Sequence, residues 1–271
     1  MSIKLIASDM DGTLLNSDAR LSPRTIAAAK AAMAHGAHFV LASGRMIEAI
    51  LFAARDIGVN APIIAYNGGA TYDTAQHQII HQVPIRADIA RELASFAELM
   101  DLHVQGYRDG GYFVARHNQY SSFYTGSIRI EANATGMPIS EWISGDQMKL
   151  LIISEPERID AALPLFVERF SGRINCTRSI PQFIECTAIG ADKGAALKQL
   201  SAQLGIASDE IMAFGDAGND VEMLTFAGHS FAMQSGSERA KACAKHIAPT
   251  CDEDGVAQII EQYIADGRIS H

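Results

Sequence analysis

Both ends of this chain alternate short apolar runs with helical patterns, and this alternation restricts the possible folds more than any other feature of the sequence. In the first third, strands are expected over 3–8, 39–42 and 62–66, with helices over 22–34 and 46–57. A hairpin at 70–73 and 79–83 follows them. Strands that alternate with helices are typical of a parallel sheet with helices packed against its faces.

The last third resumes this pattern, with strands expected at 211–214 and 230–233 and helices at 193–204, after 219, and at 255–265. The middle differs, because its strands and helices do not alternate regularly. Domains typically hold about 50–250 residues, so a chain of 271 residues favours two domains. We therefore predict a doubly wound, Rossmann-like α/β core made of residues 1–84 and 189–271, interrupted by an inserted α+β domain at 85–188.

The composition limits the partners that this chain can bind. A net charge of −9 provides no general basic field, so binding to nucleic acid or to an anionic membrane is not expected. The apolar start at 3–8 is too short for a signal peptide, and no later stretch is long enough to span a bilayer. We predict a cytoplasmic protein with a small-molecule partner, and both a monomer and a homodimer fit the sequence.

The cysteines and histidines form no recognisable site. Cys176, Cys186, Cys243 and Cys251 show neither a CxxC pair nor zinc-like spacing, so they are expected to be reduced thiols that pack as small apolar residues. The nine histidines include no HExxH or similar pair, and we assign them to the surface or the core.

Residues that suit phosphate chemistry occur where several of the expected strands end. They are Asp9, Asp11, Ser43, Gly44, Arg45, Asp216 and Asp220, with Lys193 at the start of the helix that precedes the last two. In open α/β sheets ligands bind beyond the carboxyl ends of the strands. We therefore expect these side chains to converge at one edge of the core sheet.

The acidic members of this set require a compensating cation, because carboxylates gathered at one sheet edge repel one another. An all-oxygen site suits Mg²⁺, which binds a few carboxylates, keeps several waters and accepts a phosphate oxygen. The Ser43 hydroxyl, the Lys193 ammonium and helix N-termini would supply the other phosphate contacts. The sequence thus predicts a magnesium site beside a phosphate-binding site.

Four short segments match one known family in order and spacing. They are DMDGT at 9–13, SGR at 43–45, DKG at 192–194 and GDAGND at 215–220. In these segments the chain resembles the phosphatases of the haloacid dehalogenase superfamily. The insertion between the second and third segments looks like the large α+β cap of the Cof-type branch. The resemblance implies a Mg²⁺-dependent phosphatase that hydrolyses small phosphorylated metabolites, such as sugar phosphates, through an aspartyl-phosphate intermediate.

The resemblance also implies a role for each matching residue. Asp9 would be the nucleophile that accepts the phosphoryl group, and Asp11 would be the general acid and base. Thr13 would support the loop that follows the first strand. The other phosphate-binding and substrate-binding residues would be Ser43, Gly44, Arg45, Asn67, Lys193 and Asn219.

The metal ligands implied by the resemblance come from four aspartates. Mg²⁺ would contact Asp9, the backbone carbonyl of Asp11, and Asp216. Asp220 would act on the same ion, either directly or by orienting its water ligands.

Three other functions fit part of this pattern. A phosphomutase would return the phosphoryl group of Asp9 to a substrate rather than to water. A signalling receiver domain also accepts a phosphoryl group on an aspartate, but it needs no proton donor such as Asp11 and is about one domain long. A sensor derived from an enzyme would normally lack a chemical residue, and none is missing here. We therefore expect a phosphoric monoester hydrolase.

Overall fold

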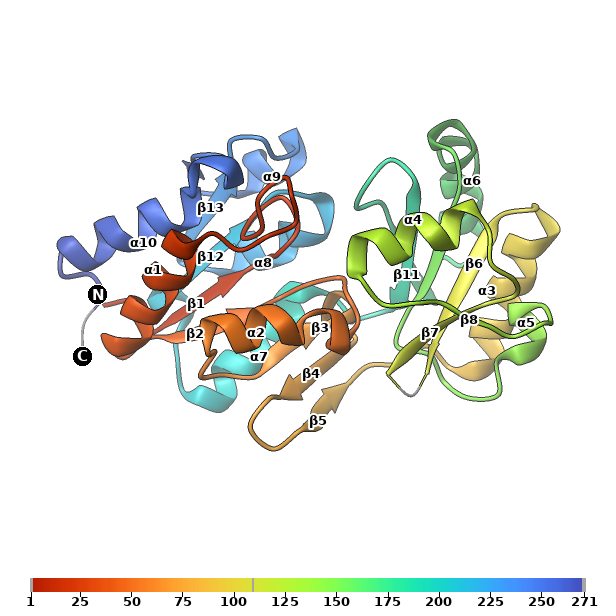
Figure 1. Ribbon diagram of the computed structural model, residues 1–271, viewed down its shortest axis with the longest axis horizontal. Coiled ribbons are helices and arrows are strands. Elements are labelled where there is room, and N and C mark those ends of the chain that lie inside the picture. Colours follow the sequence, from red (N-terminus) through yellow and green to blue (C-terminus); the bar gives the residue numbers. More distant parts are fainter. Residues whose placement is uncertain (1, 109, 270–271) are drawn as a thin grey trace. The chain divides into compact units, whose positions relative to one another are not determined.

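The computed structural model describes residues 2–108 and 110–269, and the chain divides into two compact units (Figure 1). The core unit comprises the described residues of Met1–Gly44, Ile50–His81 and Asp192–His271. The inserted unit comprises those of Arg45–Ala49 and Gln82–Ala191. Each unit has its own sheet and its own apolar core, and each is described separately below.

The core unit contains a five-stranded sheet in which all neighbouring strands are parallel. Its order is β14-β13-β12-β1-β2, with β1 (Leu5–Ser8), β2 (His38–Leu41), β12 (Ile211–Gly215), β13 (His229–Met233) and β14 (His246–Ala248). Ser8 pairs with Phe214 of β12 and with Leu41 of β2. Because these strands end side by side, the residues that follow them leave the sheet at one edge.

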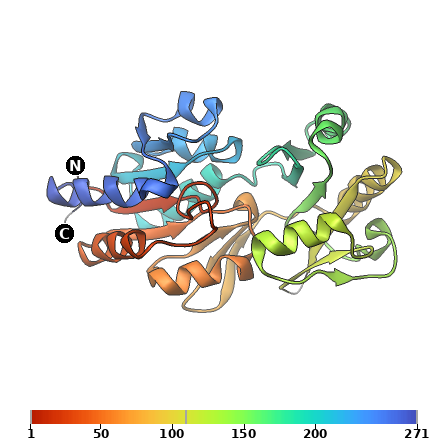
Figure 2. The ribbon, with the colours of Figure 1, turned by 45° about the horizontal axis from the view of Figure 1, so that its top comes forward.

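Helices cover both faces of this sheet, as the predicted doubly wound α/β fold requires. Helices α7 (Lys193–Leu204), α8 (Val221–Phe226) and α9 (Glu238–Cys243) pack against the face that carries Leu5, Ala7 and Val40. The other face is covered by α1 (Pro23–Ala34), α2 (Leu51–Ile57) and α10 (Gly255–Ala265), and both views show α1 beside α10 (Figures 1 and 2). Strands buried on both faces explain the continuous apolar runs in the sequence.

The predicted helix over 46–57 is only partly an α-helix. It begins as the 3-10 turn η1 (Ile47–Ala49), in which the N–H of Ala49 bonds to the carbonyl of Met46, and α2 starts only at Leu51. No side chain caps the N-terminus of α2. Shorter i to i+3 hydrogen bonds are a common way to satisfy backbone groups at such a helix end.

A second, three-stranded sheet in the core unit has the order β3-β4-β5 and includes the predicted hairpin. Its strands are β3 (Ile63–Ala65), β4 (Ala70–Asp73) and β5 (Gln78–Gln82), with the 3-10 turn η2 (Tyr66–Gly68) after β3. A parallel bridge between Ala42 and Ile64 joins β3 to the end of β2. This bridge brings the segment after β3 next to the segment after β2. The remaining 3-10 turns of the core unit are η3 (Ser208–Glu210), η4 (Gly218–Asp220) and η5 (Cys251–Glu253).

The inserted unit is an α+β structure, as predicted. Its sheet has the order β10-β11-β9-β6-β7-β8, and only the short β7–β8 pair is parallel. The strands are β6 (His103–Arg108), β7 (Gly111–Val114), β8 (Asn133–Ala134), β9 (Leu150–Ile153), β10 (Ile174–Thr177) and β11 (Phe183–Ala188). The helices are α3 (Ala87–Leu99), α4 (Gln119–Ile128), α5 (Ile139–Trp142) and α6 (Pro156–Arg169). Helices α3 and α6 bury one face of the sheet, and Tyr124 of α4 packs edge-on against Tyr112 on the other.

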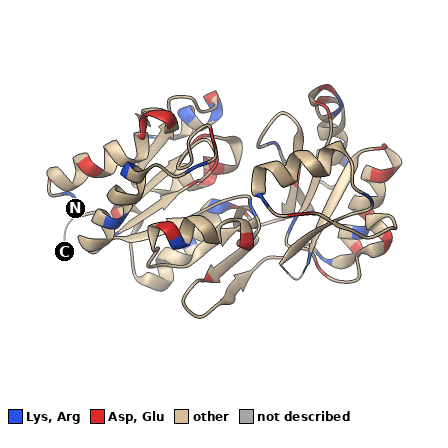
Figure 3. Cartoon of the chain, in the orientation of Figure 1, with Lys and Arg blue, Asp and Glu red and all other residues tan. Residues whose placement is uncertain are grey.

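Lys, Arg, Asp and Glu residues lie mainly on helices and loops (Figure 3). The five strands of the parallel core sheet contain no Lys, Arg, Asp or Glu. The acidic residues that are expected to act in the site therefore lie beyond the ends of these strands. Within residues 2–108 and 110–269, each helix is too short or too polar to cross a bilayer.

Candidate active site

Asp9 is the first residue beyond β1, and its side chain is directed into a buried cluster. Its N–H bonds to the carbonyl of Phe214 at 3.0 Å, so the end of β1 is tied to β12. Only 5% of Asp9 is exposed. Its Oδ1 accepts a hydrogen bond from Nζ of Lys193 at 2.5 Å.

Lys193 is the first residue of α7 and is fully buried. Its Nζ also donates to Oδ1 of Asp220 at 2.7 Å. Burial alone would lower the pKa of Lys193, but the carboxylates of Asp220 and Asp9 outweigh this effect and raise it. Lys193 therefore remains a cation between two acidic side chains, which is why a buried lysine is stable here.

The loop that carries Asp216 is held by two sets of hydrogen bonds. Oδ2 of Asp220 accepts from the N–H groups of Asp216, at 3.0 Å, and Ala217, at 2.9 Å. The Thr13 hydroxyl donates to Oδ1 of Asp216 at 3.0 Å. Thr13 thus links the loop after β1 to the loop after β12, and Asp220 both fixes its own loop and contacts Lys193.

Two glycines make this close arrangement possible, although the sequence analysis did not single them out. Gly12 has a φ of +78°, and a Cβ at this position would lie 2.7 Å from Oδ2 of Asp216. A Cβ on Gly215 would lie 2.5 Å from Cβ of Asp220. Their positions inside DMDGT and GDAGND were the available signal. Only glycine leaves room for the two aspartates and tolerates the left-handed backbone at position 12.

The aspartates at this edge are held with unfavourable electrostatics. Burial raises the pKa of Asp216 to about 6, and the charge of Asp220 adds to this effect. Burial also raises the pKa of Asp9 well above its ordinary value; the charge of Lys193 opposes this effect, and the charges of Asp220, Asp216 and Asp11 add to it. One lysine does not compensate this many carboxylates, so the cluster would be stabilised by an additional cation.

The donor set fits a divalent metal ion that prefers oxygen ligands. Asp9, Asp216 and Asp220 each offer a carboxylate oxygen, and these atoms lie within 4.8 Å of one another. Oxygen-only ligands with room for water and a phosphate oxygen suit Mg²⁺. Asp11 is exposed and, among the described side chains, is not a member of this group. The resemblance implies that Asp11 contacts the ion through its backbone carbonyl, a role that does not require its side chain in this group.

A second set of predicted residues meets beside this cluster. Ser43 follows the end of β2, is fully buried, and accepts at its carbonyl a hydrogen bond from the N–H of Asn67. Oδ1 of Asn67 accepts from Nδ2 of Asn219 at 2.9 Å. Arg45, in contrast, is buried and belongs to the inserted unit, so it is the one predicted site residue that the core unit does not contain.

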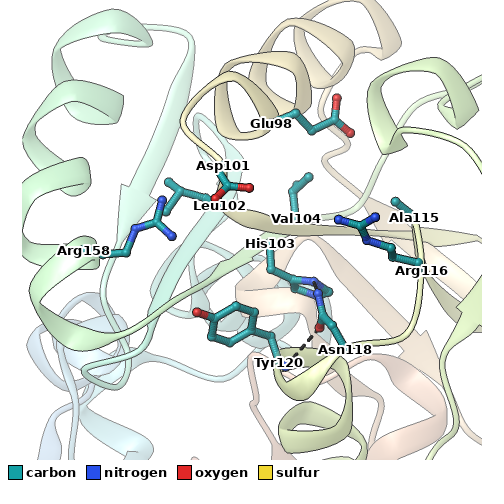
Figure 4. Close-up of a pocket in the computed structure, with 10 residues that line it drawn as sticks. All are labelled: Glu98, Asp101, Leu102, His103, Val104, Ala115, Arg116, Asn118, Tyr120 and Arg158. Carbon is teal, nitrogen blue, oxygen red and sulfur yellow. Dashed lines mark hydrogen bonds between the residues drawn. The ribbon is translucent and has the colours of Figure 1, made fainter.

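The inserted unit has a separate pocket of about 260 Å³ (Figure 4). It is lined by Glu98, Asp101, Leu102, His103, Val104, Ala115, Arg116, Asn118, Tyr120 and Arg158. Its charges are of both signs, and two of the charged groups already have hydrogen-bond partners: Ser140 donates to Glu98, and Arg158 donates to the carbonyl of Met100. The pocket contains no counterpart of the buried carboxylate cluster in the core unit, so that cluster is the candidate active site.

Comparison with known proteins agrees with the geometry. A family model of haloacid dehalogenase-like hydrolases matches residues 6–260. A predicted phosphatase of Streptococcus pyogenes serotype M6 is 29% identical over 97% of this chain and 99% of its own length. A 5-amino-6-(5-phospho-D-ribitylamino)uracil phosphatase of Bacillus subtilis is 26% identical over 96% of this chain and 97% of its own.

Among solved structures, a haloacid dehalogenase-like hydrolase from Bacteroides thetaiotaomicron has the same fold. It aligns with a TM-score of 0.87 at 28% identity, over 96% of this chain and 99% of that one. The similarity therefore includes the inserted unit as well as the core unit.

Proposed function

The chain belongs to the haloacid dehalogenase-like hydrolase family and is a phosphatase, and from this premise we propose that it hydrolyses small phosphorylated metabolites with Asp9 as the nucleophile. The observation that carries the proposal is the buried contact of Asp9 with Lys193, beside the carboxylates of Asp216 and Asp220. A carboxylate at a strand end, next to a fixed cation, suits attack on phosphorus.

The proposed reaction has two steps. In the first, a carboxylate oxygen of Asp9 forms a bond to phosphorus, the ester bond breaks, and Asp11 gives a proton to the departing oxygen. In the second, Asp11 takes a proton from water, the water oxygen bonds to phosphorus, and Asp9 is released together with inorganic phosphate. Division of one difficult step into two is the general advantage of a covalent intermediate.

Asp9, Asp216 and the backbone carbonyl of Asp11 would hold Mg²⁺, with Asp220 acting directly or through its waters. When bound, the ion would offset charge on the phosphoryl oxygens and favour the ionised form of Asp9. Lys193, Ser43, Gly44 and Asn219 would bind the same phosphoryl oxygens, together with amides at the N-terminus of α7.

We also propose that residues 85–188, with Arg45 and Asn67, select the leaving group. The named substrate of the Bacillus subtilis relative is a phosphorylated sugar alcohol attached to a pyrimidine, which supports sugar phosphates and related metabolites as the substrate class. Release of inorganic phosphate from a panel of phosphorylated metabolites, measured as kcat/KM with Mg²⁺, tests this assignment. Transfer of the phosphoryl group to a second metabolite, without phosphate release, would instead identify a phosphomutase.

A further inference from the structure

The segment after β3 has an unusual backbone. Tyr66, Asn67 and Gly68 are three consecutive residues with positive φ, at 53°, 55° and 90°. Glycine and asparagine tolerate this left-handed region, but a tyrosine adopts it only at an energetic cost. Tyr66 is 6% exposed and Asn67 is 5% exposed, so the segment is buried as well as strained. Strain of this kind persists only where the surrounding structure enforces it.

The contacts that enforce this conformation come from three parts of the candidate site. The N–H of Asn67 bonds to the carbonyl of Ser43 at 3.0 Å. A Cβ on Gly68 would lie 2.2 Å from the carbonyl oxygen of Asp192, the residue immediately before Lys193. Oδ1 of Asn67 accepts from Nδ2 of Asn219. The segment therefore touches the loop after β2, the start of α7 and the loop after β12 together.

The Asn67 contact fixes the amide of Asn219. Because Nδ2 of Asn219 donates to Asn67, rotation of the amide by half a turn would place two oxygens against each other. Oδ1 of Asn219 is buried and has no hydrogen-bond partner among the described residues. A buried acceptor without a partner is unfavourable, so its retention indicates that a donor is present in the working site.

We propose that Asn67 is a positioning residue that acts through Asn219, holding its Oδ1 toward an O–H donor in the working site. This inference rests on the proposed phosphatase function and adds to it. Two donors share this chemistry: a water bound to the metal ion and a hydroxyl of the substrate. Asn67 itself does not need to touch the substrate for this role.

The direct test is Asn67→Gly, because glycine adopts a φ of 55° freely and the substitution removes only the side-chain acceptor. We expect kcat/KM to fall at least about 10-fold, an effect comparable with loss of one well-placed hydrogen bond to the site. The matched control is His77→Gly, since His77 also has a positive φ, of 54°, but lies in the exposed turn between β4 and β5. The control should keep wild-type kinetics, and circular dichroism should show both variants folded.

A double-mutant cycle with Asn219→Ala distinguishes positioning from an independent role. If Asn67 acts through Asn219, adding Asn67→Gly to the Asn219→Ala variant should lower kcat/KM by less than about 3-fold. If the losses of kcat/KM from the two single substitutions multiply in the double variant, the proposal is wrong. The same cycle is measured by calorimetry for binding of inorganic phosphate in the presence of Mg²⁺. This readout needs no turnover, so an inactive wild type would disprove the proposed function while the positioning role is still tested.

Two further measurements on Asn219→Ala identify the donor. If the donor is a metal-bound water, the Mg²⁺ concentration for half-maximal phosphate binding should rise, and para-nitrophenyl phosphate and sorbitol 6-phosphate should be affected equally. If it is a substrate hydroxyl, kcat/KM should fall at least about 10-fold more for sorbitol 6-phosphate than for para-nitrophenyl phosphate, which lacks hydroxyl groups. Either result supports the proposal. No change in any of these quantities would show that Oδ1 of Asn219 meets no donor, and the proposal would be wrong.

Discussion

Nζ of Lys193 lies 2.5 Å from Oδ1 of Asp9, although 184 positions separate the two residues in the chain. The same nitrogen lies 2.7 Å from Oδ1 of Asp220, and the lysine is fully buried. One ammonium group therefore joins the loop after β1 to the loop after β12. Its charge offsets part of the repulsion between the buried aspartates, so its removal should affect stability as well as activity.

We predict that Lys193→Met destabilises the metal-free protein by about 3–5 kcal/mol, because it leaves two buried carboxylates without their partner. Mg²⁺ should restore part of this loss, since it supplies positive charge to the same carboxylates. The measurement is urea unfolding with a chelator and with Mg²⁺. Lys4→Met is the control: the Lys4 side chain is 55% exposed and pairs with Glu210 at the surface, so it should cost less than about 1 kcal/mol. Equal losses for the two variants would contradict the buried-pair argument.

Substitution of Asp9 and substitution of Asp11, the two aspartates of the DxD motif, should block different steps of the reaction. Asp9→Asn should abolish turnover of every substrate, because no intermediate can form. Asp11→Asn should lower kcat by about 10²–10⁴-fold with an alkyl phosphate, because the leaving group of this substrate needs a proton. With para-nitrophenyl phosphate this variant should give a burst of nitrophenol followed by slow release. Rapid-mixing kinetics check this, and equal losses for alkyl and aryl esters without a burst would show that Asp11 is not the acid and base.

Gly12→Ala should weaken the metal site. A methyl group at position 12 would lie 2.7 Å from Oδ2 of Asp216, so this carboxylate must move. We expect at least a 10-fold loss of activity and a higher Mg²⁺ requirement. Gly58→Ala is the matched control, because Gly58 has a similar φ of +74° but nothing within 4 Å of its Cβ position. If both variants had the same activity, steric exclusion at position 12 would not be the cause.

Activity should require a divalent cation, with Mg²⁺ active and Ca²⁺ inhibitory. The oxygen ligands of Asp9, Asp216 and Asp220 suit both ions, but Ca²⁺ accepts a larger and looser coordination shell that would misplace Asp9. Phosphate release is measured after exhaustive chelation and after each metal is added back. Full turnover in the chelated protein would refute a role for the cation.

His103 should make the inserted unit less stable in mild acid. Burial lowers the pKa of His103 to about 4, below the ordinary value of about 6.5 that applies in the unfolded chain. Between these values the unfolded chain binds more protons, so the stability present above pH 6.5 is lost as the pH falls toward 4. From pH 7 to pH 5 the wild type should lose roughly 1–2 kcal/mol more than His103→Gln, which cannot titrate. Chemical unfolding at both pH values measures this difference, and equal losses would argue against it.

Much of the fold follows from local patterns. The helix expected at 255–265 and the hairpin strand expected at 70–73 have these bounds in α10 and β4. Shorter elements without a clear periodicity were not predicted, among them α9 (Glu238–Cys243) and β14 (His246–Ala248). Two or three residues of an edge strand bury too little apolar surface to leave a recognisable pattern in the sequence.

The sequence by itself determined that acidic and phosphate-binding residues follow buried strands, because apolar runs of parallel strands must end at a common edge where polar side chains begin. Only the tertiary structure decided which of these side chains touch. Lys193 lies between Asp9 and Asp220, and Asn67 binds Asn219 across 152 positions, through contacts that depend on strand order and on the left-handed turn at Tyr66–Gly68. No local periodicity specifies such contacts, since they form only when distant loops pack against one another.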